Sequence, residues 1–241
     1  MKFNLNNPAF LQAGGNLLAK DDYFYITSLV DGNELTFNTG LMGIFADNIE
    51  YSVNSQEDWE QLTTDTAITL DAQETVYFRN YTGVVNTNDG AVLLNITDDF
   101  NAGGNIMCLF YPGQSAVPAK GFYELFKALP IVSAGDLKLT AKTVGARAYQ
   151  NLFYGCTSLT TAPELPATIL ANGCYNGLFS GCTSLTTVTC LAEDISASFC
   201  TSNWLENVAA TGTFIKSASM NDWTTGNNGI PTGWTVQDYV G

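Results

Sequence analysis

The ten residues LFYGCTSLTT at 152–161 return almost unchanged as LFSGCTSLTT at 178–187. They are the centre of a longer internal repeat, because residues 149–174 and 175–200 align without a gap at an offset of 26 residues and share 14 identical positions. A single unit of this length cannot bury its apolar side chains by itself. We therefore expect neighbouring units to stack and to share one continuous core.

The repeat extends beyond these two copies in a weaker form. A degenerate earlier copy begins near Phe122, and a partial later copy runs through Trp204 and Phe214. Atypical flanking copies of this kind are what the ends of a stack require. We expect a repeat module over residues 122–215 and a C-terminal cap over residues 216–241.

Each copy is expected to contain a short strand and a short helical return. Leu159 and Leu185 should begin the strands with their side chains in the core, and residues 149–153 and 175–179 should form the returns. The outer strand face varies without cost to the core, so a binding surface is expected there. Counted from the inward leucines, the outward positions that we predict to bind are Thr161, Thr187 and Thr189, with Asp136 and Lys138 one copy earlier.

The N-terminal half shows the two-residue period of β-strands. Residues 23–29 alternate, end at the turn signal Asp31-Gly32-Asn33 and resume at 35–38. Further strands are expected at Ile49–Val53, Ala67–Leu70, Thr75–Arg79, Val92–Thr97 and Asn105–Phe110. Short strands between turn residues predict a β-sandwich over residues 21–112, followed by a linker over residues 113–121.

Residues 1–20 form an N-terminal arm in this interpretation. The arm is rich in Asn, and Pro8 and the Gly14-Gly15 pair break any regular element. Two hypotheses stay open: the arm is a tail that lies on its own domain, or it is an anchor that orders against another subunit. As an anchor it would bury Phe3, Leu5, Phe10 and Leu11.

Composition and charge narrow the classes of partner. Hydrophobic residues make up 46% of the chain and charged residues only 13%, which favours a globular protein over a disordered one. The formal net charge of −14 disfavours nucleic acid and anionic membranes as partners. No apolar run reaches the roughly 18–20 residues of a membrane span. The start MKFNLNNP lacks the apolar run of a signal peptide, so we do not expect export through the Sec pathway.

The chemistry of the side chains argues against an enzyme. The chain contains no histidine, which excludes Ser-His-Asp and Cys-His catalysis and histidine metal sites. The acidic pairs Asp98-Asp99 and Glu193-Asp194 are interpreted as solvated loops rather than as a glycosidase pair. We therefore predict no catalytic residue, no metal and no cofactor.

Cysteines and aromatic residues allow further predictions. None of the six cysteines forms a CxxC pair, and Cys156 and Cys182 lie one repeat apart, so we expect rows of reduced thiols in the core. Tyr51, Trp59, Tyr77 and Tyr81 could form a carbohydrate platform. We assign the first and third of these to the core of the sandwich and expect Trp59 to be exposed.

The repeat resembles the BspA-type leucine-rich repeat, whose units share the Gly-Cys-x-Ser-Leu core seen at 155–159 and 181–185. The resemblance covers about residues 122–215, and the segment 162–168 and the C-terminal residues 213–236 look like versions frequent in anaerobic gut bacteria and their tailed phages. It implies that the repeat module is a short leucine-rich-repeat solenoid with a C-terminal cap. Together with the β-sandwich predicted for residues 21–112, this gives a mainly β fold. Members include cell-surface adhesins and phage structural proteins.

The resemblance and the missing signal peptide together favour a non-catalytic phage virion protein, a head or tail fibre or decoration protein that displays a surface for host attachment. The arm would then contact other virion proteins, the chain would form a homo-oligomer, with a trimer favoured for a fibre, and the ligand would be a host surface glycan or protein. A leucine-rich-repeat adhesin on the bacterial cell surface and an accessory carbohydrate-binding module are the alternatives.

Overall fold

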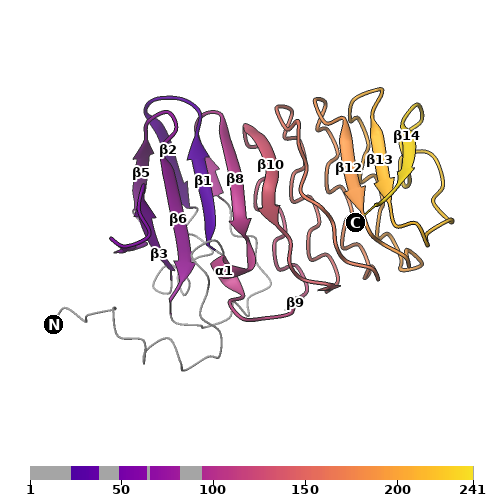
Figure 1. Ribbon diagram of the computed structural model, residues 1–241, viewed down its shortest axis with the longest axis horizontal. Coiled ribbons are helices and arrows are strands. Elements are labelled where there is room, and N and C mark those ends of the chain that lie inside the picture. The colour runs from indigo at the N-terminus through magenta and orange to yellow at the C-terminus, as the bar shows by residue number, and fades with distance from the viewer. Residues whose placement is uncertain (1–22, 38–48, 64–65, 82–93, 241) are drawn as a thin grey trace.

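The computed structural model describes residues 23–37, 49–63, 66–81 and 94–240 of the 241-residue chain. Within these residues the protein is mainly β, with several sheets, none of them closed. Figure 1 shows the strands side by side along an elongated body, with the N-terminal half at one end and the last strands at the other. One hydrophobic core runs through both halves.

The largest sheet has six strands in the order β10-β8-β1-β6-β3-β4. These strands are β1 (Phe24–Ser28), β3 (Ile49–Val53), β4 (Glu60–Gln61), β6 (Thr75–Asn80), β8 (Phe100–Asn105) and β10 (Ile131–Lys138). In β1, Phe24, Ile26 and Ser28 are buried, whereas Tyr25 and Thr27 are half-buried. The alternation turns one face of the sheet to the core and the other to solvent.

A second sheet packs against the core face of the first. It has the order β5-β2-β7 and consists of β2 (Asn33–Phe37), β5 (Ala67–Leu70) and β7 (Leu94–Ile96). Phe37 of β2 meets Phe78 of β6 edge to face, with ring centroids 5.4 Å apart. The strands predicted at residues 49–53 and 67–70 are confirmed with those bounds.

One predicted strand of this half is wrong. Residues 105–110 were expected to be extended, but they contain the short helix α1 (Met107–Phe110), and the strand β8 ends at Asn105. Gly104, the residue before the last one of β8, has a φ of 71°, which lies outside the extended range of a strand. The Oδ1 atom of Asn105 then accepts a hydrogen bond of 3.0 Å from the N–H of Met107, which turns the chain into the helix.

The two halves are joined through one sheet. Strand β10 pairs in parallel with β8, so the sheet of the N-terminal half continues into the first copy of the repeat. The rings of Phe24 and Phe126 lie 6.1 Å apart across this junction. The expected linker, residues 113–121, contains β9 (Ala116–Val117), which pairs with β11 (Thr143–Val144). The domain boundaries stay predictions, but one core spans the junction.

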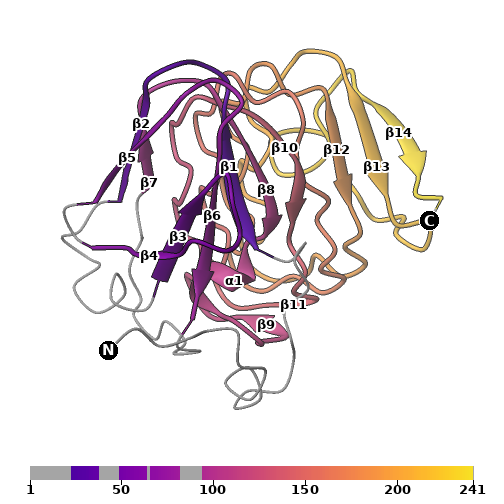
Figure 2. The ribbon, with the colours of Figure 1, turned by 60° about the vertical axis from the view of Figure 1, so that its left-hand side comes forward.

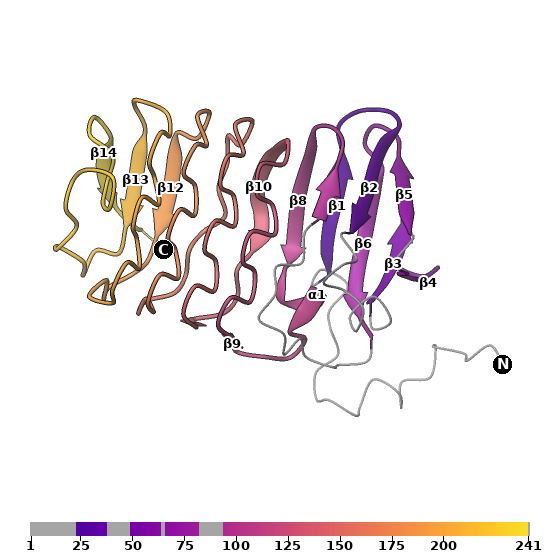
Figure 3. The same ribbon diagram turned by 180° about the vertical axis from the view of Figure 1, so that it is seen from behind.

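Each copy contributes a strand segment to one side of the body, here called the strand side, and turns to the opposite side, the return side. On the strand side, the segments of successive copies lie side by side and run parallel. The strands β12 (Thr187–Cys190), β13 (Thr213–Lys216) and β14 (Thr235–Asp238) form a parallel sheet. Figures 2 and 3 show β10, β12, β13 and β14 following one another along the body from two sides. Two side chains predicted to point inward from these copies are fully buried, namely those of Leu159 and Leu185.

The helical return predicted on the opposite side is wrong. Residues 149–153 and 175–179 form consecutive turns. Every fourth residue has a left-handed backbone, and the pattern repeats in each copy. These positions are Lys120, Glu124 and Ala128, then Arg147, Asn151 and Gly155, then Gly173, Gly177 and Gly181, and finally Phe199, Asn203 and Asn207. A left-handed residue after each turn prevents a right-handed helix from propagating.

Along these turns, backbone N–H groups that donate to the next copy alternate with N–H groups that donate within their own turn. The N–H of Phe153 donates to the carbonyl of Leu178 in the next copy over 2.9 Å, and Phe179, at the equivalent position, donates onward to the copy after that. The N–H of the intervening Tyr154 stays within its own turn and donates to Asn151 over 3.1 Å. This scheme pairs the backbone donors without a helix, but every second bond needs the neighbouring copy.

Two rows of aromatic rings run through the copies. In one row, neighbouring ring centroids are 5.3 and 5.4 Å apart and the planes are nearly parallel, across Phe126, Phe153 and Phe179. The second row consists of Phe122, Tyr149, Tyr175 and Trp204. Because rings of this size dominate the buried apolar area, each copy is stabilised mainly by its neighbours.

The cysteine of the Gly-Cys pair in each repeat forms a hydrogen bond to the preceding copy. The Sγ of Cys156 donates to the carbonyl of Phe126 over 2.9 Å, and the Sγ of Cys182 donates to the carbonyl of Phe153 over 3.0 Å. Each thiol thereby binds the backbone of the preceding copy. All six cysteines are buried, and none of them forms a disulfide bond within the described residues.

Replacing Phe153 with Ala should destabilise the chain by about 3–5 kcal/mol, because it removes a fully buried ring between two stacked neighbours. The neighbouring Tyr154 is 44% exposed, so Tyr154→Ala should change the free energy of unfolding by less than about 0.5 kcal/mol. Urea titration followed by circular dichroism measures both. An equal loss in the free energy of unfolding for the two substitutions would contradict the stabilising role of the stacked rings.

The buried thiols should make the fold sensitive to alkali. Burial raises the pKa of Cys156, Cys174 and Cys190 from an ordinary value of 9.0 to about 12. The unfolded chain releases these protons from about pH 9, whereas the folded chain holds them. Stability is therefore complete below about pH 9 and is lost as the pH rises toward 12.

The melting temperature in the presence of reductant should consequently fall between pH 9 and 11, and the fall should be shallower in Cys190→Ala, which has one buried thiol fewer. Thiol titration should find almost no reactive groups in the native chain and about six after unfolding. A melting temperature that is independent of pH, or a slope that is identical in the variant, would contradict this account.

Candidate functional site

The three threonines predicted to bind lie on the strand side, outside the core. Thr161 and Thr187 are exposed, and Thr189 is half-buried. Thr187 lies in register with Thr213 of β13, which lies in register with Thr235 of β14. The hydroxyls of the last two approach to 3.2 Å. The outer strand face of the repeats therefore carries a strip of hydroxyl groups.

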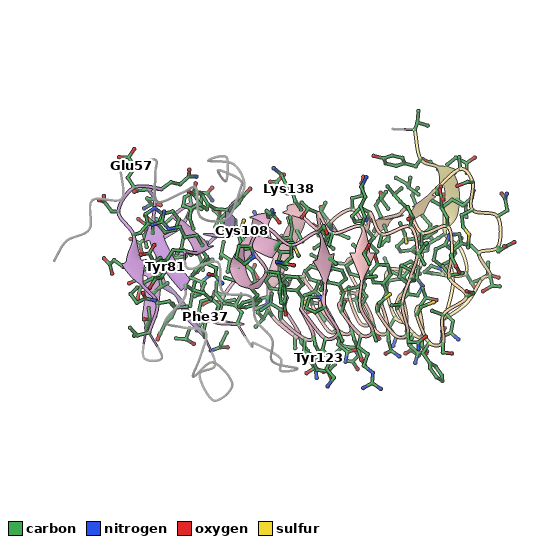
Figure 4. The ribbon with its side chains drawn as sticks, turned by 90° about the horizontal axis from the view of Figure 1, so that it is seen from below. Phe37, Glu57, Tyr81, Cys108, Tyr123 and Lys138 are labelled. Atoms are coloured by element: carbon green, nitrogen blue, oxygen red, sulfur yellow. The ribbon has the colours of Figure 1, made fainter. Side chains whose placement is uncertain are left out.

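Asp136 and Lys138 are exposed on β10, but the structure places them against the N-terminal half. Asp136 lies in register with Gly103 of β8, and Lys138 with Asn105. Both line a groove on the solvent face of the six-stranded sheet, which none of the three predicted threonines lines. Figure 4 shows Lys138 and Glu57 on one face of the body and Tyr123, from the return side, on the opposite face.

The groove has a volume of about 700 Å³ and lies over the middle of the sheet. Strands β10, β8, β1 and β6 form its floor, and the loop before β4 adds a side chain from above. Its main side chains are Tyr23, Tyr25, Gln56, Tyr77, Asp136 and Lys138. Tyr25 and Tyr77 are paired across β1 and β6, with ring centroids 5.8 Å apart and planes inclined by 55°.

A glycine pair makes room for the floor of the groove. The ring of Tyr25 lies against Gly103, where an added Cβ would come within 2.2 Å of the tyrosine Cζ. At Gly104, which is left-handed, an added Cβ would come within 1.7 Å of the Tyr23 carbonyl oxygen. These two positions let β8 pass directly beneath the tyrosine rings, so the shape of the groove depends on them.

Several polar groups in the groove have no partner. Within the described part of the chain, no hydrogen bond engages the hydroxyl of Tyr25, the hydroxyl of Tyr77, the side-chain amide of Gln56 or the carboxylate of Asp136. Burial, the charge of Asp136 and the neighbouring Tyr77 raise the pKa of Tyr25. The Tyr25 hydroxyl therefore keeps its proton at neutral pH and is available as a donor.

An aromatic and cationic cluster holds the loop at the rim. Tyr23 meets Trp59 edge to face at 5.1 Å, and the guanidinium carbon of Arg79 lies 3.9 Å from the centre of the Trp59 ring. Arg79 also forms an ion pair of 2.6 Å with Glu50. The indole N–H of Trp59 donates to the Gln56 carbonyl over 3.0 Å, which positions the loop residue that lines the groove.

The tyrosine assignments from the sequence were partly wrong. Tyr77, which was assigned to the core, faces the groove, because β6 buries Val76 and Phe78 instead. Tyr51 packs partly against the core and donates to Glu60 over 2.7 Å, and burial together with this bond raises its pKa to about 12. Tyr81 is 48% exposed and lies outside the groove lining.

Three residues that line the groove were not predicted from the sequence, namely Tyr23, Tyr25 and Gln56. A signal for the tyrosines existed, because residues 23–27 alternate as Tyr-Phe-Tyr-Ile-Thr and residues 75–79 as Thr-Val-Tyr-Phe-Arg. The apolar side chains of both segments must share the core face, so both sets of tyrosines must share the opposite one.

The remaining predicted residues give no second site. Phe3, Leu5, Phe10 and Leu11 lie outside the residues that the structure describes. Asp194 accepts a hydrogen bond from the backbone N–H of Ser196, and Glu193 accepts one from the hydroxyl of Ser217, 24 residues further along the chain. Across the described ranges no cluster of three or more His, Cys, Asp or Glu side chains could hold a metal ion, and no helix is both long and apolar enough to cross a membrane.

Comparison with protein-family models, with curated proteins and with solved structures finds no match to this chain.

Proposed function

We propose that this chain is a non-catalytic structural protein of a tailed-phage virion, a head or tail fibre or decoration protein, which displays a binding surface for host attachment. The observation that carries the proposal is the groove on the solvent face of the six-stranded sheet. Its floor is made of paired strands, which hold side chains more rigidly than loops, and it offers polar groups that have no partner within the described chain.

The proposed architecture is an N-terminal β-sandwich followed by a short leucine-rich-repeat solenoid with a C-terminal cap. The bonds between copies at an offset of one repeat and the parallel strand side support the solenoid. The cap is supported by Trp223, which stacks on Trp204 at 5.3 Å, and by Trp234, which donates from its indole to the Ala209 carbonyl over 2.8 Å. Trp223 thereby extends the second aromatic row at its C-terminal end.

Binding is favoured over catalysis by the residue types available. The chain has no histidine, so it lacks the usual general base near neutral pH. The groove presents phenols, an amide and a carboxylate at separate positions. These groups suit recognition through hydrogen bonds and ring contacts.

The virion setting rests on the resemblance of the repeat and on the apolar N-terminal arm. The arm, with Phe3, Leu5, Phe10 and Leu11, would contact other virion proteins and support a homo-oligomer, a trimer for a fibre. A cell-surface adhesin would place the same surface on a bacterium. The groove is also what supports the other alternative, an accessory carbohydrate-binding module. Such a module would act as an isolated monomer.

The virion proposal is tested with antibody raised against the purified chain. Particles from cultures that make the chain should retain it through density-gradient purification, and immunogold should label the head or the tail. The purified chain should also slow adsorption of the particles by competing for the host. A chain found on the bacterial envelope and absent from purified particles would instead support the adhesin.

The arm is tested by deleting residues 2–20. The truncated chain should keep the circular dichroism spectrum and melting temperature of the full chain but lose its oligomeric state in light scattering, because the apolar side chains that would join the subunits are gone. The matched control replaces Pro8 with Ala, which leaves those side chains in place. If the truncated chain assembles like the full chain, the arm is only a tail.

A further inference from the structure

The groove over Tyr25 and Tyr77 was not predicted from the sequence as one site, although it contains Asp136 and Lys138, which were predicted to bind, and Tyr77, a candidate for a carbohydrate platform. We infer that it is a carbohydrate-binding site, in which the rings of Tyr25 and Tyr77 pack against the C–H face of a sugar ring and Asp136 and Gln56 bind its hydroxyl groups. This inference rests on the proposed function, since it names the class of ligand for the displayed surface.

The two tyrosines supply the apolar part of such a site. Their rings are neighbours on adjacent strands, with centroids 5.8 Å apart, and both are half-buried, so ring surface is left open to a ligand. The face of an aromatic ring carries partial negative charge and attracts the weakly positive C–H groups on one face of a sugar. Neighbouring rings inclined by 55° suit a curved saccharide rather than a flat base.

The polar groups supply the other part. A sugar presents hydroxyls that both donate and accept, so its site needs both kinds of partner. The Asp136 carboxylate accepts, the hydroxyl of Tyr25 can donate, and the amide of Gln56 does both. These groups lie around the same groove, and none of them is engaged elsewhere in the described chain. Thr27 and Thr75, whose hydroxyls lie 2.8 Å apart, add further partners along one side.

A peptide fits the groove less well. Extended peptides usually gain affinity by pairing with a free strand edge. The groove lies over β8, β1 and β6, and β1 is paired on both sides along its length, so its backbone groups are already engaged. A ligand here meets side chains only. Nucleic acid is disfavoured by the net charge of −14.

The glycine beneath the tyrosine provides a test that deletes no lining side chain. In Gly103→Ala, the new Cβ would lie within 2.2 Å of Tyr25 Cζ and 2.3 Å of its hydroxyl oxygen. These atoms are the far end of a side chain that can move, so the ring should shift into the groove while the strand stays in place. Sugar binding should therefore weaken although every polar partner is retained.

The experiment is saturation-transfer NMR followed by calorimetry on the full chain. The probes are glucose, galactose, mannose, rhamnose and N-acetylglucosamine, each as the free sugar and as a short oligosaccharide, together with a pool of random tripeptides. Tyr25→Ala and Tyr77→Ala should each weaken the binding of the preferred sugar about fivefold. Gly103→Ala and Asp136→Asn should weaken it as well.

Two controls separate the groove from the rest of the surface. Tyr154→Ala removes an exposed tyrosine and Ile169→Ala removes an exposed isoleucine, and neither residue lines the groove; neither substitution should change the affinity. All variants should keep the wild-type circular dichroism spectrum. For any variant that does not, Tyr77→Phe, which keeps the ring and removes one hydroxyl, takes its place and should show a smaller loss.

A folded wild-type chain that binds none of the sugars would overturn the inference. So would sugar binding that survives both tyrosine substitutions, or tripeptides that bind in place of sugars. These outcomes do not decide the proposed function, which depends on the presence of the chain in particles. Conversely, a chain that binds sugars through the groove but is absent from particles would leave the inference standing and favour the carbohydrate-binding module.

Discussion

The hydrogen bonds that join one copy of the repeat to the next on the return side are the constraint on which the rest of the structure depends. Every second N–H there donates to the following copy, as Phe153 does to Leu178, so no copy can satisfy its own backbone. The same spacing stacks the phenylalanine rings and brings Cys156 and Cys182 each to a carbonyl of the preceding copy. A stack built in this way is open at both ends, and each end must be covered.

The N-terminal half of the chain covers the first end of the stack, and the candidate site lies where the two meet. Strand β10 is the first strand of the stack, and it pairs with β8 of the six-stranded sheet, so the N-terminal half closes the stack through an ordinary parallel ladder. This pairing sets Asp136 beside Gly103 and hence beside the ring of Tyr25. The groove therefore combines side chains from both halves of the chain, and its geometry is as rigid as the junction that forms it.

Much of this arrangement could be predicted from residue patterns. The nearly identical segments at 152–161 and 178–187 predicted the stacked copies and the inward leucines, and alternation predicted most strands of the N-terminal half. The turns of the return side could not be predicted, because left-handed residues such as Arg147 and Phe199 carry no signal by type and the segment has apolar residues at helical spacing. The groove was missed because it depends on the register between β10 and β8, which only the folded chain determines.

The most direct test of the central claim is a long-range NMR experiment that detects scalar coupling across hydrogen bonds in an isotope-labelled and deuterated sample. The account predicts a correlation from the amide nitrogen of Phe153 to the carbonyl carbon of Leu178, and an equivalent one from Phe179 to Trp204, the residues that these N–H groups reach over 2.9 and 2.8 Å. Correlations from Phe153 to Tyr149 within its own copy would show a helical return and would contradict the account.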